Sequence, residues 1–118
     1  MVIFDRESRP EDRRNDMRFN IKVKAVYQSD GGAKCLGVTE NISSSGLLFN
    51  ITKSQGADEL DVGDTGSIAI MADVDGKQTP LVLKCEIVHI GDKGIGINFK
   101  KSNINAMAML EQFIMRSL

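Results

Sequence analysis

The sequence of 118 residues has few of the side chains on which catalysis and metal binding usually depend. Its only histidine, His89, has no nucleophile or metal ligand near it in the sequence, so we interpret it as a rim residue of a strand. The cysteines Cys35 and Cys85 lie far apart, each within an apolar run, and lack the spacing of metal ligands. Buried thiols are therefore favoured over a disulfide, no metal site is expected, and the chain is not expected to be an enzyme.

Long apolar runs are also missing. No segment approaches the length that crosses a membrane, and residues 1–4 give way at once to charged residues, unlike a signal peptide. We therefore expect a cytoplasmic protein without membrane insertion. The phosphate-binding Walker loop and the dinucleotide fingerprint are absent as well, so no cofactor is expected.

The chain carries no excess of positive charge, because 15 lysines and arginines face 16 aspartates and glutamates, for a net charge of −1. General binding to nucleic acids needs a basic surface that displaces counterions from many phosphates. We therefore expect neither DNA nor RNA as a partner, and any anion site must be local.

The length fits one domain. Residues 1–18 are almost wholly polar, carry both signs of charge and show no period, which is typical of a mobile segment. We interpret residues 1–12 as a flexible N-terminal arm and residues 13–118 as a single domain.

Apolar and polar residues alternate in several short runs after this segment, and turn residues separate the runs. Glycines at 31–32 and 76 and the turn at 91–94 suit hairpins, whereas residues 53–64 are typical of a surface loop. With no helix between them, the strands favour an all-β fold, a six-stranded antiparallel barrel. The expected strands are 19–27, the run ending near 39, 47–51, the run around 68–70, 81–87 and 95–99.

A C-terminal helix is predicted at about residues 103–116. Met107, Leu110, Phe113 or Ile114, and Leu118 follow at helical spacing and form one apolar stripe. The stripe packs against the barrel or, alternatively, binds a partner protein through its adaptable methionines.

Three arginines, Arg13, Arg14 and Arg18, lie within six residues directly before the first strand. They could be a solvated charge run offset by nearby aspartates. Guanidinium groups are also planar forks that bind phosphate oxygens or the O6/N7 edge of guanine. The cluster is therefore a candidate nucleotide-binding element.

The segment Asn41-Ile42-Ser43-Ser44-Ser45-Gly46 joins the second and third strands. It could be an ordinary serine-rich turn. Its hydroxyl and backbone N–H groups could also converge on an anion, while the amide of Asn41 offers both a donor and an acceptor to a base edge. The turn is a second candidate binding element.

These two motifs, Arg14-x-x-x-Arg18 and Asn41-x-Ser43-x-x-Gly46, together with the later run Gly94-Ile95-Gly96-Ile97-Asn98-Phe99, resemble the PilZ domain family. The resemblance covers about nine-tenths of the chain. It implies a six-stranded antiparallel barrel with a C-terminal helix that binds the bacterial second messenger cyclic di-GMP.

The resemblance also implies roles for individual residues. Arg14 and Arg18 would contact guanine and phosphate, and Asn41, Ser43 and Gly46 would hold the guanine and backbone from the barrel. Asn41 departs from the commoner aspartate, so one neutral carbonyl replaces two anionic oxygens. An arginine before the motif, here Arg13, implies an intercalated ligand dimer, which corresponds to two ligands per chain.

Two functions follow as hypotheses. The first is a cyclic di-GMP receptor or adaptor that orders its N-terminal arginine arm on binding and signals to a downstream protein partner. The alternative is a protein-interaction module of the same fold that does not sense the nucleotide.

Overall fold

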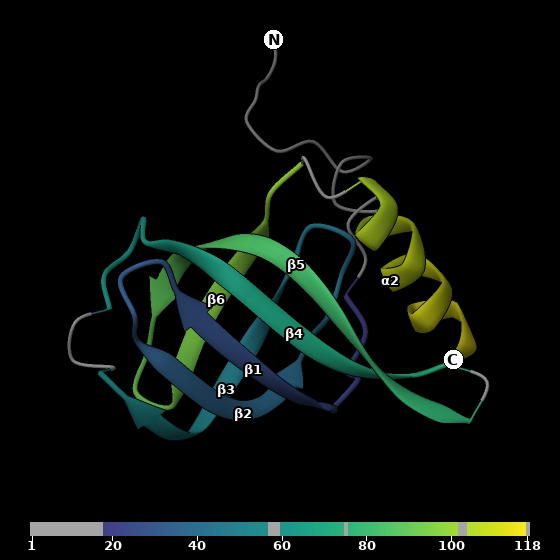
Figure 1. The fold of residues 1–118 in the computed structure, drawn as a ribbon, viewed down its shortest axis with the longest axis horizontal. Coiled ribbons are helices and arrows are strands. Elements are labelled where there is room, and N and C mark those ends of the chain that lie inside the picture. The colour runs from purple at the N-terminus through teal and green to yellow at the C-terminus, as the bar shows by residue number, and fades with distance from the viewer. Residues whose placement is uncertain (1–17, 57–59, 75, 102–103, 118) are drawn as a thin grey trace, which may run out of the picture.

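The computed structural model describes residues 18–56, 60–74, 76–101 and 104–117. The arm predicted at 1–12 lies outside these residues. The described chain contains six strands and a helix, α2 (Figure 1). Their bounds are β1 Lys24–Ser29, β2 Lys34–Glu40, β3 Gly46–Gln55, β4 Thr65–Val74, β5 Lys77–Ile90, β6 Gly94–Phe99 and α2 Ile104–Arg116.

The strands form a closed antiparallel barrel in the order β1-β2-β3-β6-β5-β4. The barrel closes where β1 pairs with β4. Closure leaves no unpaired edge strand, which is the arrangement that protects a small β protein from pairing with other chains. The predicted six-stranded antiparallel barrel is thus confirmed.

The alternation read from the sequence is the inside-outside pattern of the barrel wall. On β1, Ala25 and Tyr27 point into the core while Lys24 and Gln28 are exposed. The interior is filled mainly by branched aliphatic side chains, with Tyr27 and Phe49 as its largest members. Burial of these apolar side chains is the main source of stability for such a wall. The buried strand residues include Leu47, Phe49, Ile68, Ile70, Leu81, Leu83, Ile87, Ile95 and Ile97.

The first strand begins later than predicted, at Lys24 instead of residue 19. The hydroxyl of Thr39 accepts a hydrogen bond from the N–H of Val23 at 3.1 Å and donates one to the carbonyl of Ile21 at 3.0 Å. The hydroxyl of Thr39 therefore takes the N–H of Val23 and the carbonyl of Ile21, while the N–H of Thr39 still donates to the carbonyl of Val23 at 2.8 Å. The predicted face is kept, because Phe19, Ile21 and Val23 pack against the core.

Three strands are longer than predicted. β4, Thr65–Val74, extends on both sides of the run predicted around residues 68–70. β3 continues to Gln55, into the segment expected to be a loop, and β5 extends from Lys77 to Ile90. Residues 52–55 are all exposed although residues 53–55 pair with β2, so no alternation marks them in the sequence. The pairing slips by one residue between Leu36 and Gly37, and the hydroxyl of Thr52 donates to the carbonyl of Leu36 at 3.1 Å.

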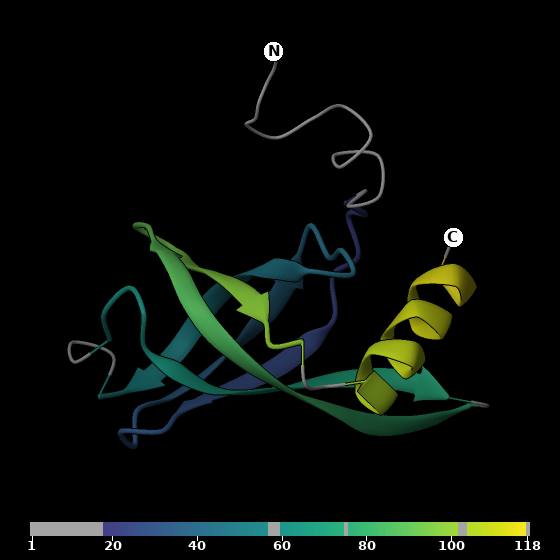
Figure 2. The same cartoon turned by 90° about the horizontal axis from the view of Figure 1, so that it is seen from above.

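Helix α2 lies to one side of the barrel and contacts β5 and β4 (Figure 2). Leu110, Phe113 and Ile114 are buried and Met107 packs against the core, which confirms the predicted stripe. Both Phe113 and Ile114 belong to it. Leu118 lies outside the described residues, and no helix among the described residues is long and apolar enough to cross a membrane.

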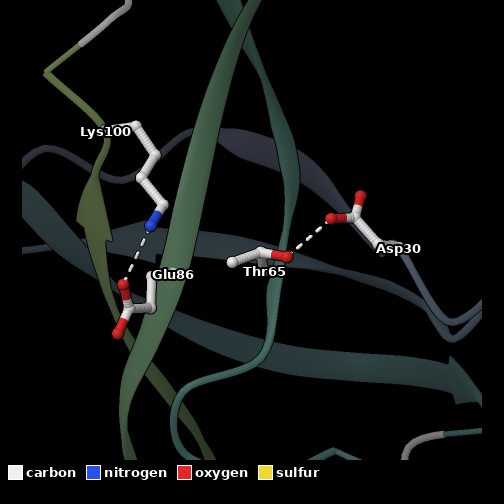
Figure 3. A network of polar contacts seen from close by, with 4 residues as sticks. All are labelled: Asp30, Thr65, Glu86 and Lys100. Carbon is white, nitrogen blue, oxygen red and sulfur yellow. Dashed lines mark hydrogen bonds and ion pairs between the residues drawn. The ribbon is translucent and has the colours of Figure 1, made fainter.

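Polar contacts tie neighbouring segments of the barrel together (Figure 3). The hydroxyl of Thr65 donates to Oδ2 of Asp30 at 2.6 Å, which links the β1–β2 turn to the start of β4. Nζ of Lys100 lies 3.0 Å from Oε1 of Glu86. The second pair is well exposed, so its contribution to stability is small.

Both cysteines are buried free thiols, as predicted. Burial raises the pKa of the Cys85 thiol from 9.0 to about 12 and also raises the pKa of Cys35. The reactive thiolate form is therefore suppressed at neutral pH, and both residues act as small apolar side chains of the core.

Candidate functional site

The β2–β3 turn, residues 41–45, is organised around the side chain of Ser43, which is fully buried. Its hydroxyl accepts hydrogen bonds from the N–H groups of Ser45 and Gly46, both at 3.2 Å. The same hydroxyl lies 3.3 Å from the carbonyl oxygen of Gly46, to which it donates. Serine belongs at this position because a short side chain with both donor and acceptor capacity closes the turn locally.

Gly46 seats this turn against β6. A Cβ atom at this residue would lie 2.0 Å from the carbonyl oxygen of Ile97, a distance that no side chain tolerates. The N–H of Phe99 also donates to the carbonyl of Ser45 at 2.7 Å. The glycine is therefore required by the close approach of two backbones.

Asn41 begins the turn with a φ of 51°, in the left-handed region, and its side chain is half-buried. Asparagine adopts this conformation more readily than most residues. The change of backbone direction here places the carbonyl of Asn41 within reach of Arg18.

The segment before β1 runs beside this turn (Figure 1). Phe19 and Ile42 form an isolated antiparallel bridge in which each N–H donates to the other's carbonyl at 2.8 Å. Nη1 of Arg18 donates to the carbonyl of Asn41 at 3.2 Å. The structure therefore brings together four of the predicted site residues, namely Arg18, Asn41, Ser43 and Gly46.

Arg13 and Arg14 lie outside the described residues, so the structure does not place them. The four residues that it places divide into two groups. Arg18 is exposed and Asn41 half-buried, whereas Ser43 and Gly46 are buried. The first pair offers a guanidinium fork and an amide to a ligand, while the second pair shapes the turn that positions them.

Sequence reasoning missed Glu40, the last residue of β2. It is half-buried, and Nδ2 of Asn50 lies 3.4 Å from its Oε2. Glu40 shares the outer face of β2 with Leu36 and Val38, so the alternation of the strand could have placed it beside the turn. The Phe19–Ile42 bridge was missed as well, because no local signal marks it.

Other chemistry has no support among the residues that the structure describes. No group of three or more metal-ligating side chains lies together in that part of the chain. His89 is exposed on β5, in keeping with its interpretation as a rim residue.

The comparisons with known proteins agree with the observed fold. The model of the PilZ domain family matches residues 12–116. The crystal structure of the PilZ domain of CeSA from a cellulose-synthesizing bacterium is similar in fold, with a TM-score of 0.67 and 16% sequence identity, over 86% of this chain and 98% of that one. No curated protein matches the sequence significantly. The resemblance to this family is thus confirmed, and the chain belongs to the PilZ domain family.

Proposed function

We propose that this protein is a cytoplasmic receptor for cyclic di-GMP that acts as an adaptor rather than as an enzyme. Membership of a family of cyclic di-GMP receptors supports binding of this messenger in general. The observation that carries the proposal is the Phe19–Ile42 bridge, since it holds Arg18 beside Asn41 at the predicted turn.

The chemistry of the site suits a guanine nucleotide. The guanidinium of Arg18 forms a fork that matches the O6/N7 edge of guanine or two phosphate oxygens. The amide of Asn41 adds a donor and an acceptor at its side. Both residues already lie on the barrel, so the ligand meets a partly organised surface, which lowers the entropic cost of binding.

The arginine arm completes the proposed mechanism. Arg13 and Arg14 close over the bound messenger, and the ordered arm presents a new surface to a downstream protein partner. Ordering of a segment by a ligand is a general switching mode. Because an arginine, Arg13, directly precedes the motif, the messenger binds as an intercalated dimer, which gives two ligands per chain.

Calorimetric titration of the purified protein with cyclic di-GMP tests this proposal, with GTP and cyclic GMP as control ligands. We expect binding of cyclic di-GMP alone, at two molecules per chain. Because a good bidentate guanine contact is worth about 1–3 kcal/mol, Arg18→Ala should weaken binding at least about tenfold.

The matched control is Lys93→Ala, which removes an exposed cation from the turn before β6, at the end of that strand remote from Phe99. It should leave affinity unchanged. Absence of any binding by the wild-type protein would reject the receptor, and an Arg18→Ala variant that binds as tightly as wild type would reject the role of Arg18.

The alternative function is an interaction module that does not sense the nucleotide. One observation favours a protein contact at α2, where Ile104 is 77% and Met115 70% exposed. Exposed apolar side chains of this kind suit adaptable protein surfaces. Failure of the wild-type protein to bind cyclic di-GMP, with its fold intact, would favour this reading over the receptor.

A further inference from the structure

Glu40 carries a negative charge next to a proposed binding site for an anionic ligand, where the charge would repel the phosphates of the ligand. It ends β2, directly before Asn41, and its side chain belongs to the outer face of the barrel. Arg18 donates to the backbone of the next residue, Asn41. Glu40 is thus half-buried and directly precedes a residue of the proposed nucleotide site.

The hydrogen-bonding capacity of this carboxylate is largely unused. Nδ2 of Asn50 donates to Oε2 at 3.4 Å, which is long for a hydrogen bond. Within the part of the chain that the structure describes, the carboxylate accepts no other hydrogen bond. A half-buried carboxylate gains much from donors that complete its shell, because charge-assisted hydrogen bonds are the stronger ones.

The surface next to Glu40 is apolar. Leu48 pairs with Glu40 across the β2–β3 ladder and is 37% exposed on the same outer face. Residues that are directly opposite in an antiparallel pair have neighbouring side chains. An acceptor group and an aliphatic side chain therefore lie side by side on the outer face of the barrel, one residue before Asn41, whose carbonyl accepts a hydrogen bond from Arg18. A planar base with a donor edge requires this combination.

The charge of Glu40 decides which part of the messenger it meets. A carboxylate repels the two phosphates, so a contact with them would oppose binding. Guanine carries N1–H and N2–H₂ on its Watson–Crick edge, and these donors suit a carboxylate. The adjacent O6/N7 edge suits the fork of Arg18. Guanidinium and carboxylate can therefore bind two edges of the same base.

We propose that Glu40 is a specificity-determining residue that accepts hydrogen bonds from N1–H and N2–H₂ of a guanine base whose face lies on Leu48. The proposal rests on the proposed function as a cyclic di-GMP receptor. The neutral Asn41 does not supply an anionic acceptor. The proposal assigns this acceptor to Glu40, the residue immediately before it.

The test compares cyclic di-GMP with cyclic di-IMP, in which hypoxanthine replaces guanine and the N2 amino group is absent. Both ligands are titrated into the wild-type protein and into Glu40→Gln. Wild type should prefer cyclic di-GMP by about tenfold or more, the effect of one charge-assisted hydrogen bond. Glu40→Gln should lose most of this preference, because its neutral amide accepts more weakly.

Glu86→Gln is the matched control. Glu86 is also half-buried and outward-facing, but it lies on β5, with β3 and β6 between it and β2, and it pairs with Lys100. This variant should keep the preference of wild type. The ratio of the two affinities is an internal measure that a general loss of stability does not change.

The outcomes separate the two proposals. If wild type binds neither ligand, the receptor function itself is rejected. If wild type binds cyclic di-GMP without preferring it over cyclic di-IMP, or if Glu40→Gln keeps the full preference, the receptor stands and the role of Glu40 is overturned. An equal loss of affinity for both ligands in Glu40→Gln would overturn it as well, since the side chain would then support the surface without recognising N2–H₂.

Discussion

Ser43 shows how a motif residue can shape a turn without facing solvent. Its hydroxyl is fully buried and holds the N–H groups of Ser45 and Gly46. Buried polar groups are stable only when they are paired, so this hydroxyl and the two amides depend on one another. In the structure the serine of the motif sets the shape of the turn, while Arg18 is exposed and Asn41 is half-buried.

We predict that Ser43→Ala destabilises the protein by about 1–3 kcal/mol, because it leaves two N–H groups of the turn without their acceptor. Ser44→Ala is the matched control in the same turn, since the half-buried Ser44 has no hydrogen bond recorded in the described part of the chain. Urea denaturation of both variants gives the comparison. Equal stability of the two variants would mean that the hydroxyl of Ser43 does not hold the turn.

At the scale of elements, α2 combines two surfaces. One face buries Leu110, Phe113 and Ile114 against β4 and β5, while Ile104 and Met115 on the helix remain largely exposed. A helix of 13 residues is marginal by itself in water, so the packed face must supply most of its stability. The exposed residues are then free to vary without loss of the fold.

Truncation of α2 should therefore depend on the face that is changed. Leu110→Ala should lower the free energy of unfolding by about 2–5 kcal/mol, the usual cost of a cavity at a fully buried leucine. Met115→Ala, at an exposed position of the same helix, should change it by less than about 0.5 kcal/mol. Thermal and denaturant unfolding measure both effects. If Leu110→Ala left the free energy of unfolding unchanged, α2 would contribute little to the core.

At the scale of the whole molecule, closure of the barrel assembles the site. The β2–β3 turn is held on one side by the segment before β1, through the Phe19–Ile42 bridge. On the other side it is held by the end of β6, through Phe99 and Ser45. Segments from three parts of the sequence thus converge on one turn, so the turn is structurally coupled to the chain that leads into β1.

This coupling makes the proposed switch testable by hydrogen exchange. Saturating cyclic di-GMP should slow exchange of the backbone amides of residues 13–17, because ordered segments exchange more slowly than mobile ones. Arg18→Ala at the same ligand concentration should show a smaller effect. If saturating cyclic di-GMP left the exchange rates of these amides unchanged in the wild-type protein, the proposed ordering of the arm would be rejected. The receptor function would not be affected by this result.

Much of the fold could be predicted from the sequence, and the errors have identifiable causes. Alternation revealed each strand whose two faces differ in polarity, whereas residues 52–55 were missed because both faces are exposed. The early start assigned to β1 came from a real apolar face, but the hydroxyl of Thr39 occupies the backbone groups of Ile21 and Val23. The pattern of apolar residues does not reveal a side chain that replaces a hydrogen bond of the strand ladder, so the start of β1 could not be predicted from it.

The sequence by itself determined the strand and helix patterns, the buried thiols and the two motifs, because these depend on residues that are neighbours along the chain. Only the tertiary structure decided that Arg18 lies against Asn41, that Ser43 is buried beneath the turn and that Glu40 pairs with Leu48 on the outer face of the barrel. Those relations depend on strand register and barrel closure, which set distances between residues remote in sequence.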